Sequence, residues 1–286
     1  MAKKEKEIKV RPPQYFTSYT NIPTLNYAVY YMSPIEKILY ALLAFAAGAL
    51  VGYIFYGGLA KDEFDNPTTL TTILNVTICS ALGIFAAVMF IPMRTKSIIA
   101  GRKRQLKEQF RELLDSLSTS LGSGKNVVDS FHNAYSDMAV LFSEDAYMTK
   151  ELAVIESGLA NNVAIEDMLM DLGKRSDIPD IESFANVFET CYRKGGNIKD
   201  VIKSTQNILV DKMEVELEIE TIIASAKNEL NIMCCMPIAL VGIIKLMSPE
   251  FAKNFTTPVG IIATTVGVVF FVGAYLIGKV VMEIKL

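Results

Sequence analysis

The stretch ILYALLAFAAGALVGYIFYGGLA, residues 38–60, decides the fold because its 23 residues contain no charged side chain. Three further uncharged stretches follow at residues 66–93, 230–244 and 254–278. A helix needs about 20 apolar residues to cross roughly 30 Å of hydrocarbon, so three of the stretches suffice and residues 230–244 are marginal. We therefore predict four membrane-spanning helices and exclude a soluble single-domain protein.

The positions of Lys and Arg predict the orientation of these helices. Positive charges cluster before the first span and after the second, whereas the connections at residues 61–65 and 246–253 hold few. Since cytoplasmic loops are enriched in Lys and Arg, we expect both termini in the cytoplasm. The same pattern supports the marginal third span, because without it Lys279 and Lys285 would lie outside. We expect Lys245, near the outer end of that span, to reach toward the lipid headgroups.

The cytoplasmic block between the second and third spans carries the periodicity of amphipathic helices. Six apolar stripes are separated by breaks, and Asn126 and Asn197 stand where capping side chains are favoured. The first five stripes begin at Leu106, Val127, Met148, Ile165 and Ile181, and the sixth lies on a helix expected from about Ile198. The predicted fold is an all-α, multi-pass membrane protein with four transmembrane helices and one cytoplasmic six-helix bundle.

The predicted domains follow from these boundaries. They are a cytoplasmic N-terminal segment (1–34), a transmembrane hairpin (35–93), a cytoplasmic helical domain (94–230) and a second transmembrane hairpin with a cytoplasmic C-terminus (231–286). The break at residues 176–180 supplies polar cap residues and a proline suited to a helix start. The first apolar stretch begins more than 30 residues from Met1 and is too long for a signal-peptide core, so we expect it to remain as an anchor.

The sixth stripe requires a choice, because residues 214–220 alternate acidic and apolar side chains like a strand. A lone exposed strand would lack a partner, whereas Val215 and Ile222 fall on one helical face, so we predict a helix. Its acidic face is either solvated or a docking surface for a basic partner. Candidate cytoplasmic docking or lipid-headgroup contacts are Arg102, Lys103, Arg104, Glu214 and Glu218.

Small residues in the first span form a candidate packing stripe. Ala44, Gly48 and Gly52 recur at four-residue spacing, which lets a second helix approach closely. The alternative is chance, since such triplets are common in spans rich in Ala and Gly.

The sequence offers no catalytic, cofactor-binding or metal site. Gly122-Ser-Gly124-Lys125 resembles the end of a phosphate-binding loop, but Thr119 and Asn126 stand where that motif needs Gly and Ser or Thr. The four cysteines lack a Cys-x-x-Cys spacing, and His132 is the only histidine. The net charge of −3 does not imply a nucleic-acid partner, and the span interiors lack the ionisable residues of pumps. We therefore expect a non-enzymatic protein.

Several motifs together resemble one family. Leu172-Gly-Lys-Arg-Ser-Asp-Ile-Pro-Asp-Ile-Glu-Ser-Phe184 and Gly195-Gly-Asn-Ile-Lys-Asp-Val201 resemble the F domain of type II secretion and type IV pilus platform proteins. Pro237, Ser248-Pro-Glu-Phe251, Thr257-Pro-Val-Gly260 and the terminal Gly278-Lys-Val-Val-Met-Glu-Ile284 resemble the tight-adherence (Tad) branch. The resemblance covers residues 100–286.

The resemblance implies a membrane scaffold in the cytoplasmic (inner) membrane. Its expected partners are a hexameric secretion or pilus ATPase, pilin subunits, membrane lipids, and a second F-domain subunit or further copies of itself. Gly195 and Gly196 correspond to the family's turn glycines, followed by Asn197 as a cap, and their expected role is backbone geometry. The alternative is a membrane-anchored signalling or sensor scaffold, which also needs only spans and a bundle.

Overall fold

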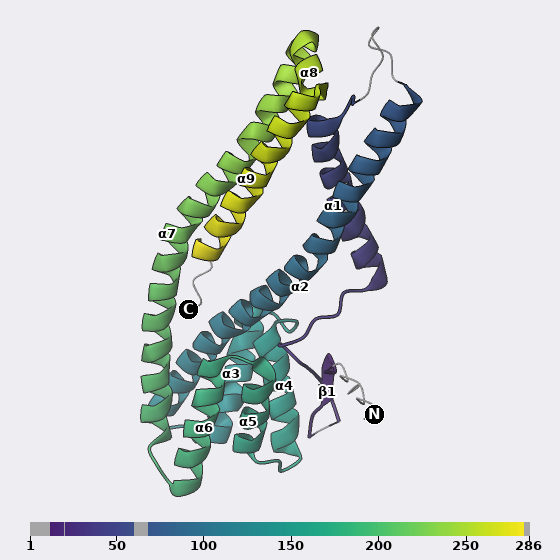
Figure 1. Cartoon of the computed structure of the whole chain (residues 1–286). Helices are drawn as coiled ribbons and strands as arrows, with labels where there is room; N and C mark the ends of the chain where they lie inside the picture. The colour runs from purple at the N-terminus through teal and green to yellow at the C-terminus, as the bar shows by residue number, and fades with distance from the viewer. Residues whose placement is uncertain (1–11, 20, 60–67, 283–286) are drawn as a thin grey trace, which may run out of the picture. The chain divides into compact units, whose positions relative to one another are not determined.

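The computed structural model describes residues 12–19, 21–59 and 68–282 of the chain, and these residues are nearly all helical (Figure 1). They form two compact units. The bundle unit contains the chain up to Tyr31 together with Thr95–Met213, and the span unit contains Met32–Arg94 together with Glu214–Leu286.

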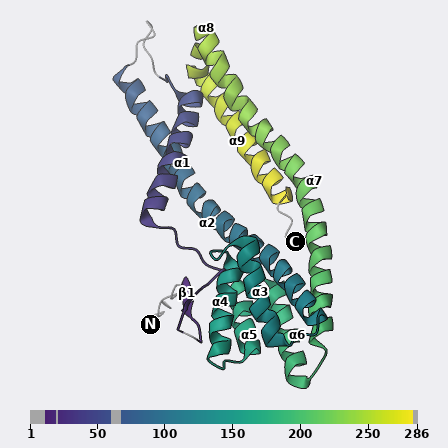
Figure 2. The ribbon, with the colours of Figure 1, turned by 180° about the vertical axis from the view of Figure 1, so that it is seen from behind.

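Six helices contribute to the bundle unit. They are the C-terminal part of α2 (Thr69–Gly122), then α3 (Val127–Phe142), α4 (Tyr147–Ala160), α5 (Ile165–Ser176), α6 (Pro179–Lys194) and the start of α7 (Ile198–Met247). Helices α3 to α6 stand side by side in both views (Figures 1 and 2). Their apolar stripes bury a common core in which Phe110 meets the edge of Phe184 and Phe131 meets the edge of Phe188.

The breaks between these helices have local causes. The Asn126 side chain caps α3 by accepting a hydrogen bond from the Asp129 backbone N–H at 2.8 Å. At the start of α6 the N-cap is Ile178, not one of the polar residues expected there, and Pro179 occupies the first turn. The buried hydroxyl of Ser176 instead accepts a hydrogen bond from the Ile178 N–H at 3.2 Å.

The described residues are predominantly helical, as expected, and they also form a short β-hairpin that the sequence did not predict. Strand β1 (Tyr15–Thr17) pairs antiparallel with β2 (Pro23–Leu25), and Tyr15 lies opposite Leu25. Each strand has only three residues, which is too short for an alternating pattern to reveal. The hairpin belongs to the bundle unit.

Among the residues that the structure describes, four helices are long and apolar enough to cross a membrane. These are α1 (Pro34–Tyr56), α2, α7 and α9 (Pro258–Met282), while the short α8 (Pro249–Thr256) connects α7 to α9. Helices α2 and α7 continue without a break through the expected domain boundaries at residues 94 and 230. Residues 214–220 lie inside α7, so the prediction of helix rather than strand is confirmed.

Lys245 is engaged within the protein. Its ammonium donates hydrogen bonds to the carbonyl oxygens of Phe55 at 3.3 Å and Gly57 at 3.5 Å, and it lies 5.3 Å from the centre of the Phe255 ring. A cation at the C-terminal end of α1 is favoured by the helix dipole. The lysine therefore ties α7 to α1, a role that the sequence analysis did not anticipate when it assigned Lys245 to headgroups.

Candidate functional site

The N-terminal strap, defined here as residues 12–19 and 21–31, packs against α4 and α5 of the bundle. Its turn uses Asn21 at φ +59°, a left-handed conformation that Asn tolerates better than most residues. Thr24 and Tyr27 are almost fully buried, with 3% and 1% of their surfaces exposed. The strap is therefore part of the folded unit, although it precedes the first candidate span in the sequence.

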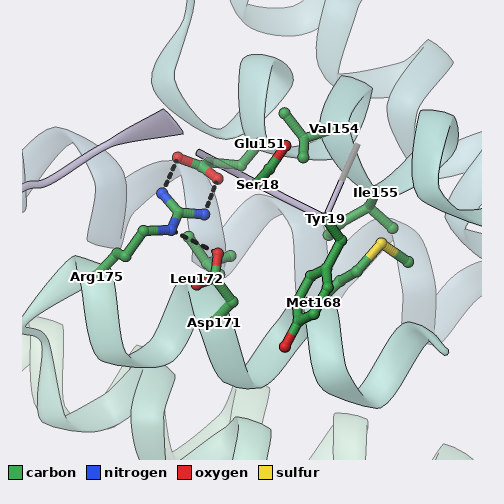
Figure 3. Close-up of a pocket in the computed structure, with 9 residues that line it drawn as sticks. All are labelled: Ser18, Tyr19, Glu151, Val154, Ile155, Met168, Asp171, Leu172 and Arg175. Atoms are coloured by element: carbon green, nitrogen blue, oxygen red, sulfur yellow. Dashed lines mark hydrogen bonds and ion pairs between the residues drawn. The ribbon is translucent and has the colours of Figure 1, made fainter. Parts of the chain in front are cut away.

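A buried ion pair lies beneath the strap (Figure 3). Arg175 of α5 binds Glu151 of α4 through two parallel hydrogen bonds, Nη2 to Oε2 at 2.7 Å and Nη1 to Oε1 at 3.1 Å. The Arg175 Nε also donates to Asp171 at 2.6 Å. Both side chains of the central pair are 5% exposed, so each charge depends on its partner for the solvation that water would supply.

The strap completes this network. The Tyr27 hydroxyl donates to Glu151 Oε1 at 2.9 Å, and the Tyr27 backbone N–H donates to the Arg175 carbonyl at 3.0 Å. The Arg175 Nη1 in turn donates to the Leu25 carbonyl at 3.0 Å. We call Tyr27, Glu151, Asp171 and Arg175 the strap network, because it fixes the strap to both helices.

Electrostatics keep Tyr27 protonated and Arg175 charged. Burial, followed by the negative charge of Glu151, raises the pKa of Tyr27 far above its usual range. Burial alone would lower the pKa of Arg175, but the hydrogen bonds and charges of Glu151 and Asp171 outweigh it and raise that pKa. The phenol therefore stays a donor and the guanidinium stays charged at neutral pH.

The cavities beside the network are consistent with a structural role. A cavity of about 10 Å³ lies against Arg175 and Glu151 and is lined by Ser18 and Tyr19, which leaves room for about one water molecule (Figure 3). A larger one of about 420 Å³ lies between the strap and α4. Among the residues that the structure describes, no three His, Cys, Asp or Glu side chains converge as metal ligands.

The predicted turn lies at the junction of α6 and α7. Gly195 has φ +74°, the left-handed conformation that caps α6, whereas Gly196 has no positive φ. A Cβ on Gly196 would instead lie 3.2–3.3 Å from Cys191. The Asn197 Oδ1 accepts a long hydrogen bond of 3.4 Å from the Asp200 N–H at the start of α7. The two glycines thus meet different requirements: one sets a backbone angle and the other allows a close approach.

The small-residue stripe faces α2. A Cβ on Gly48 would lie 2.8 Å from both the Ala86 Cβ and the Leu82 carbonyl oxygen. A Cβ on Gly52 would lie 3.0 Å from the Leu82 side chain, and Ala44 is 9% exposed. The absence of side chains at Gly48 and Gly52 therefore sets the distance between α1 and α2.

The candidate basic contacts after the second span are engaged within the bundle unit. Arg102 stacks over Tyr30 of the strap at 4.3 Å. Lys103 forms an ion pair with Asp177, and Arg104 bonds Glu108 at 3.1 Å. None of these three residues joins the strap network.

The candidate acidic contacts, Glu214 and Glu218, lie on an exposed part of α7 within the span unit. The strap network belongs to the bundle unit.

The strap network was not predicted from the sequence, although one signal for it is present there. Arg175 follows Leu172 by three positions on the apolar face of α5, and Glu151 follows Met148 by three positions on the apolar face of α4. Charged residues on core faces are rarely buried without a partner. Two such residues on neighbouring helices were therefore a reason to expect an ion pair.

Comparison with known families adds to this geometry. Residues 113–245 match the family described as type II secretion system (T2SS), protein F. The matched part runs from the end of α2, through the bundle, into the apolar part of α7. No curated protein and no solved structure gave a significant match. This part of the chain is thus similar to the F-protein family, a class of membrane platform components rather than enzymes.

Proposed function

We propose that the chain is an inner-membrane platform protein of a Tad-type or type IV pilus, or of a type II secretion-like machine. In this role it would couple a cytoplasmic hexameric ATPase to the assembly of pilin subunits. The observation that carries the proposal is the F-protein match at residues 113–245, which lies on helices that continue into candidate membrane spans at both ends.

The proposed topology places both termini and the bundle in the cytoplasm. The distribution of Lys and Arg supports it, because the segments before the first span and after the second are the most basic. The motifs that resemble the Tad branch beyond residue 245 support the narrower assignment. A second F-domain subunit, or further copies of this chain, would complete the platform.

Continuous helices favour a mechanical role over a catalytic one. Helix α7 runs for 50 residues without interruption and bonds its interior backbone groups within itself except at Pro237, so a displacement at one end is carried along its length. Movement imposed on the bundle by an ATPase would then reach the membrane through α7 and α2.

Affinity purification of the full chain from cross-linked native membranes tests this function. We expect a hexameric ATPase and pilin subunits to co-purify, and we expect deletion of the gene to abolish the appendage or the secretion. As a control, the ATPase should not be recovered from cells that lack the chain. Recovery of a kinase or receptor instead, with assembly and secretion intact in the deletion strain, would support a signalling scaffold and overturn the proposal.

A further inference from the structure

We propose that α7 docks a basic amphipathic helix of a partner protein just before its candidate membrane span. The inference rests on the proposed function and deepens it by giving the chemistry of one partner. The surface, which we call the acid-edged stripe, consists of Val215, Ile219, Ile222 and Ala226 with Glu214 and Glu218 along one edge.

The stripe is apolar and largely exposed in the part of the chain that the structure describes. Val215 is 53% exposed and Ile222 is 66% exposed, while Ala226 is exposed and Ile219 is half-buried. Exposed apolar residues inside a span contact lipid, but this stripe precedes the uncharged stretch at residues 230–244 and is separated from it by two charged residues. Contact with lipid hydrocarbon therefore does not explain why these apolar side chains are exposed. Exposed apolar patches can mark sites of interaction with another protein.

The spacing of the stripe specifies the shape of the partner. Its four apolar residues follow at intervals of four, three and four, which is the seam of a coiled coil. Side chains at such positions fit between those of a second helix that carries the same spacing. A helix is therefore a better match than a strand or a flat surface.

The charge beside the seam specifies the chemistry of the partner. Glu214 and Glu218 are four residues apart and so lie on the same side of the helix, and both are exposed. Neither forms an ion pair within the part of the chain that the structure describes. A partner helix with Lys or Arg along the facing edge would supply the opposite charges.

A second copy of α7 in a parallel arrangement is a poor occupant for the same reason. It would place Asp211 near Glu216 of the second copy, so that like charges face each other. An anionic membrane surface would be repelled by the same carboxylates. A basic helix from another protein avoids both conflicts.

Peptide binding to the full chain in zwitterionic lipid nanodiscs tests the inference. Two labelled synthetic helices would share one apolar heptad seam and differ only in flanking residues, Lys in one and Glu in the other. We expect the Lys-flanked peptide to bind about tenfold tighter or better at low salt, because unlike charges then face each other. Added salt should reduce the difference in affinity between the two peptides, because salt screens the interaction between exposed charges.

Leu217 provides a matched control. It is 53% exposed, like Val215, but lies on the opposite side of α7. We expect Val215→Lys and Ile222→Lys to abolish binding of the Lys-flanked peptide and Leu217→Lys to leave it unchanged. The double variant Glu214→Lys/Glu218→Lys should reverse the preference between the two peptides.

Four results would overturn the inference. The first two are equal binding of both peptides and an equal loss of binding in Leu217→Lys. The third is cross-linking of two copies of the Val215→Cys variant without peptide, and the fourth is tighter peptide binding after deletion of residues 1–11. The third would identify a second copy as the occupant, and the fourth would identify the chain's own basic N-terminal segment. Peptide binding is measured without the ATPase or pilins, so its failure is distinguishable from a failure of the platform function.

Discussion

Arg175 and Glu151 compensate each other's charge in a place that water scarcely reaches. Their side chains are 5% exposed, and Tyr27 and the Leu25 carbonyl add further hydrogen bonds to the pair. Removing one member leaves the other buried without compensation, which costs more than removing both. The pair therefore makes the position of the strap sensitive to single substitutions.

We predict that Arg175→Met lowers the free energy of unfolding of the bundle by about 3–5 kcal/mol, because Glu151 is left as an uncompensated buried charge. Thermal unfolding of the detergent-solubilised chain, followed by circular dichroism, measures this. Arg104→Met is the control, since the Arg104–Glu108 pair is exposed and such pairs contribute about 1 kcal/mol or less. The double variant Arg175→Met/Glu151→Leu should recover much of the loss, and a double variant as unstable as the single one would contradict the argument.

Tyr27 predicts a dependence of stability on alkaline pH. Its folded-state pKa is raised, so the unfolded chain loses this proton first, near the ordinary value of 10.0, while the folded chain keeps it. Stability from Tyr27 is therefore complete below pH 10 and decreases as the pH rises above it, by about 1.4 kcal/mol per pH unit. Tyr27→Phe removes the ionisable phenol. The unfolding free energy of this variant should therefore decrease less steeply above pH 10 than that of the wild type. Parallel slopes for the two proteins would show that Tyr27 does not remain protonated in the fold.

At the scale of elements, α1 and α2 approach closely because Gly48 lacks a side chain. We predict that Gly48→Ala destabilises the contact by about 1–3 kcal/mol, since its Cβ would overlap Ala86 and the Leu82 carbonyl. Unfolding in mixed micelles with increasing SDS measures the loss. Gly273→Ala in α9 is the matched control, because no atom lies within 4 Å of its added Cβ. An equal effect of the two changes would mean that Gly48 acts through helix propensity alone.

Periodicity was enough to predict most helices, because each one has to bury an apolar stripe. The end of α2 at Gly122 and the cap of α3 at Asn126 could also be predicted from the sequence, since both depend on local backbone chemistry. The continuity of α2 was not predicted. Charges begin at Arg94, but a change from apolar to charged residues does not interrupt a helix, and Pro92 lies within α2 without ending it.

The strap and its network could not be read in full from local patterns. Its strands are three residues long, and their partners lie more than a hundred positions away, as the contact between Tyr27 and Glu151 shows. Such contacts are set by tertiary packing, on which periodicity carries no information. The sequence was enough to predict the turn at Gly195 and the small-residue stripe that includes Gly48. The structure was needed to show that Gly195 has a left-handed backbone and that Gly48 lies against α2.

At the scale of the whole molecule, the proposed topology can be tested directly. We predict that reporters fused after residues 20, 150 and 286 report the cytoplasm, because the flanking segments are rich in Lys and Arg. Reporters inserted at residues 63 and 252 should report the outside. Paired alkaline phosphatase and green fluorescent protein fusions make the measurement, with each fusion at one site serving as the control for the other. A reporter at residue 150 that reads outside would overturn the model.

The strap also determines the order in which the chain can mature during synthesis. Leu25 binds Arg175, 150 positions later in the chain. At about 5–20 residues per second, a ribosome needs roughly 7–30 s to make the intervening sequence. During that interval the first two spans have left the ribosome, but the strap has no binding site. The N-terminal residues therefore remain open to proteases and chaperones until α5 emerges, and the bundle closes over them only after the membrane anchor has been made.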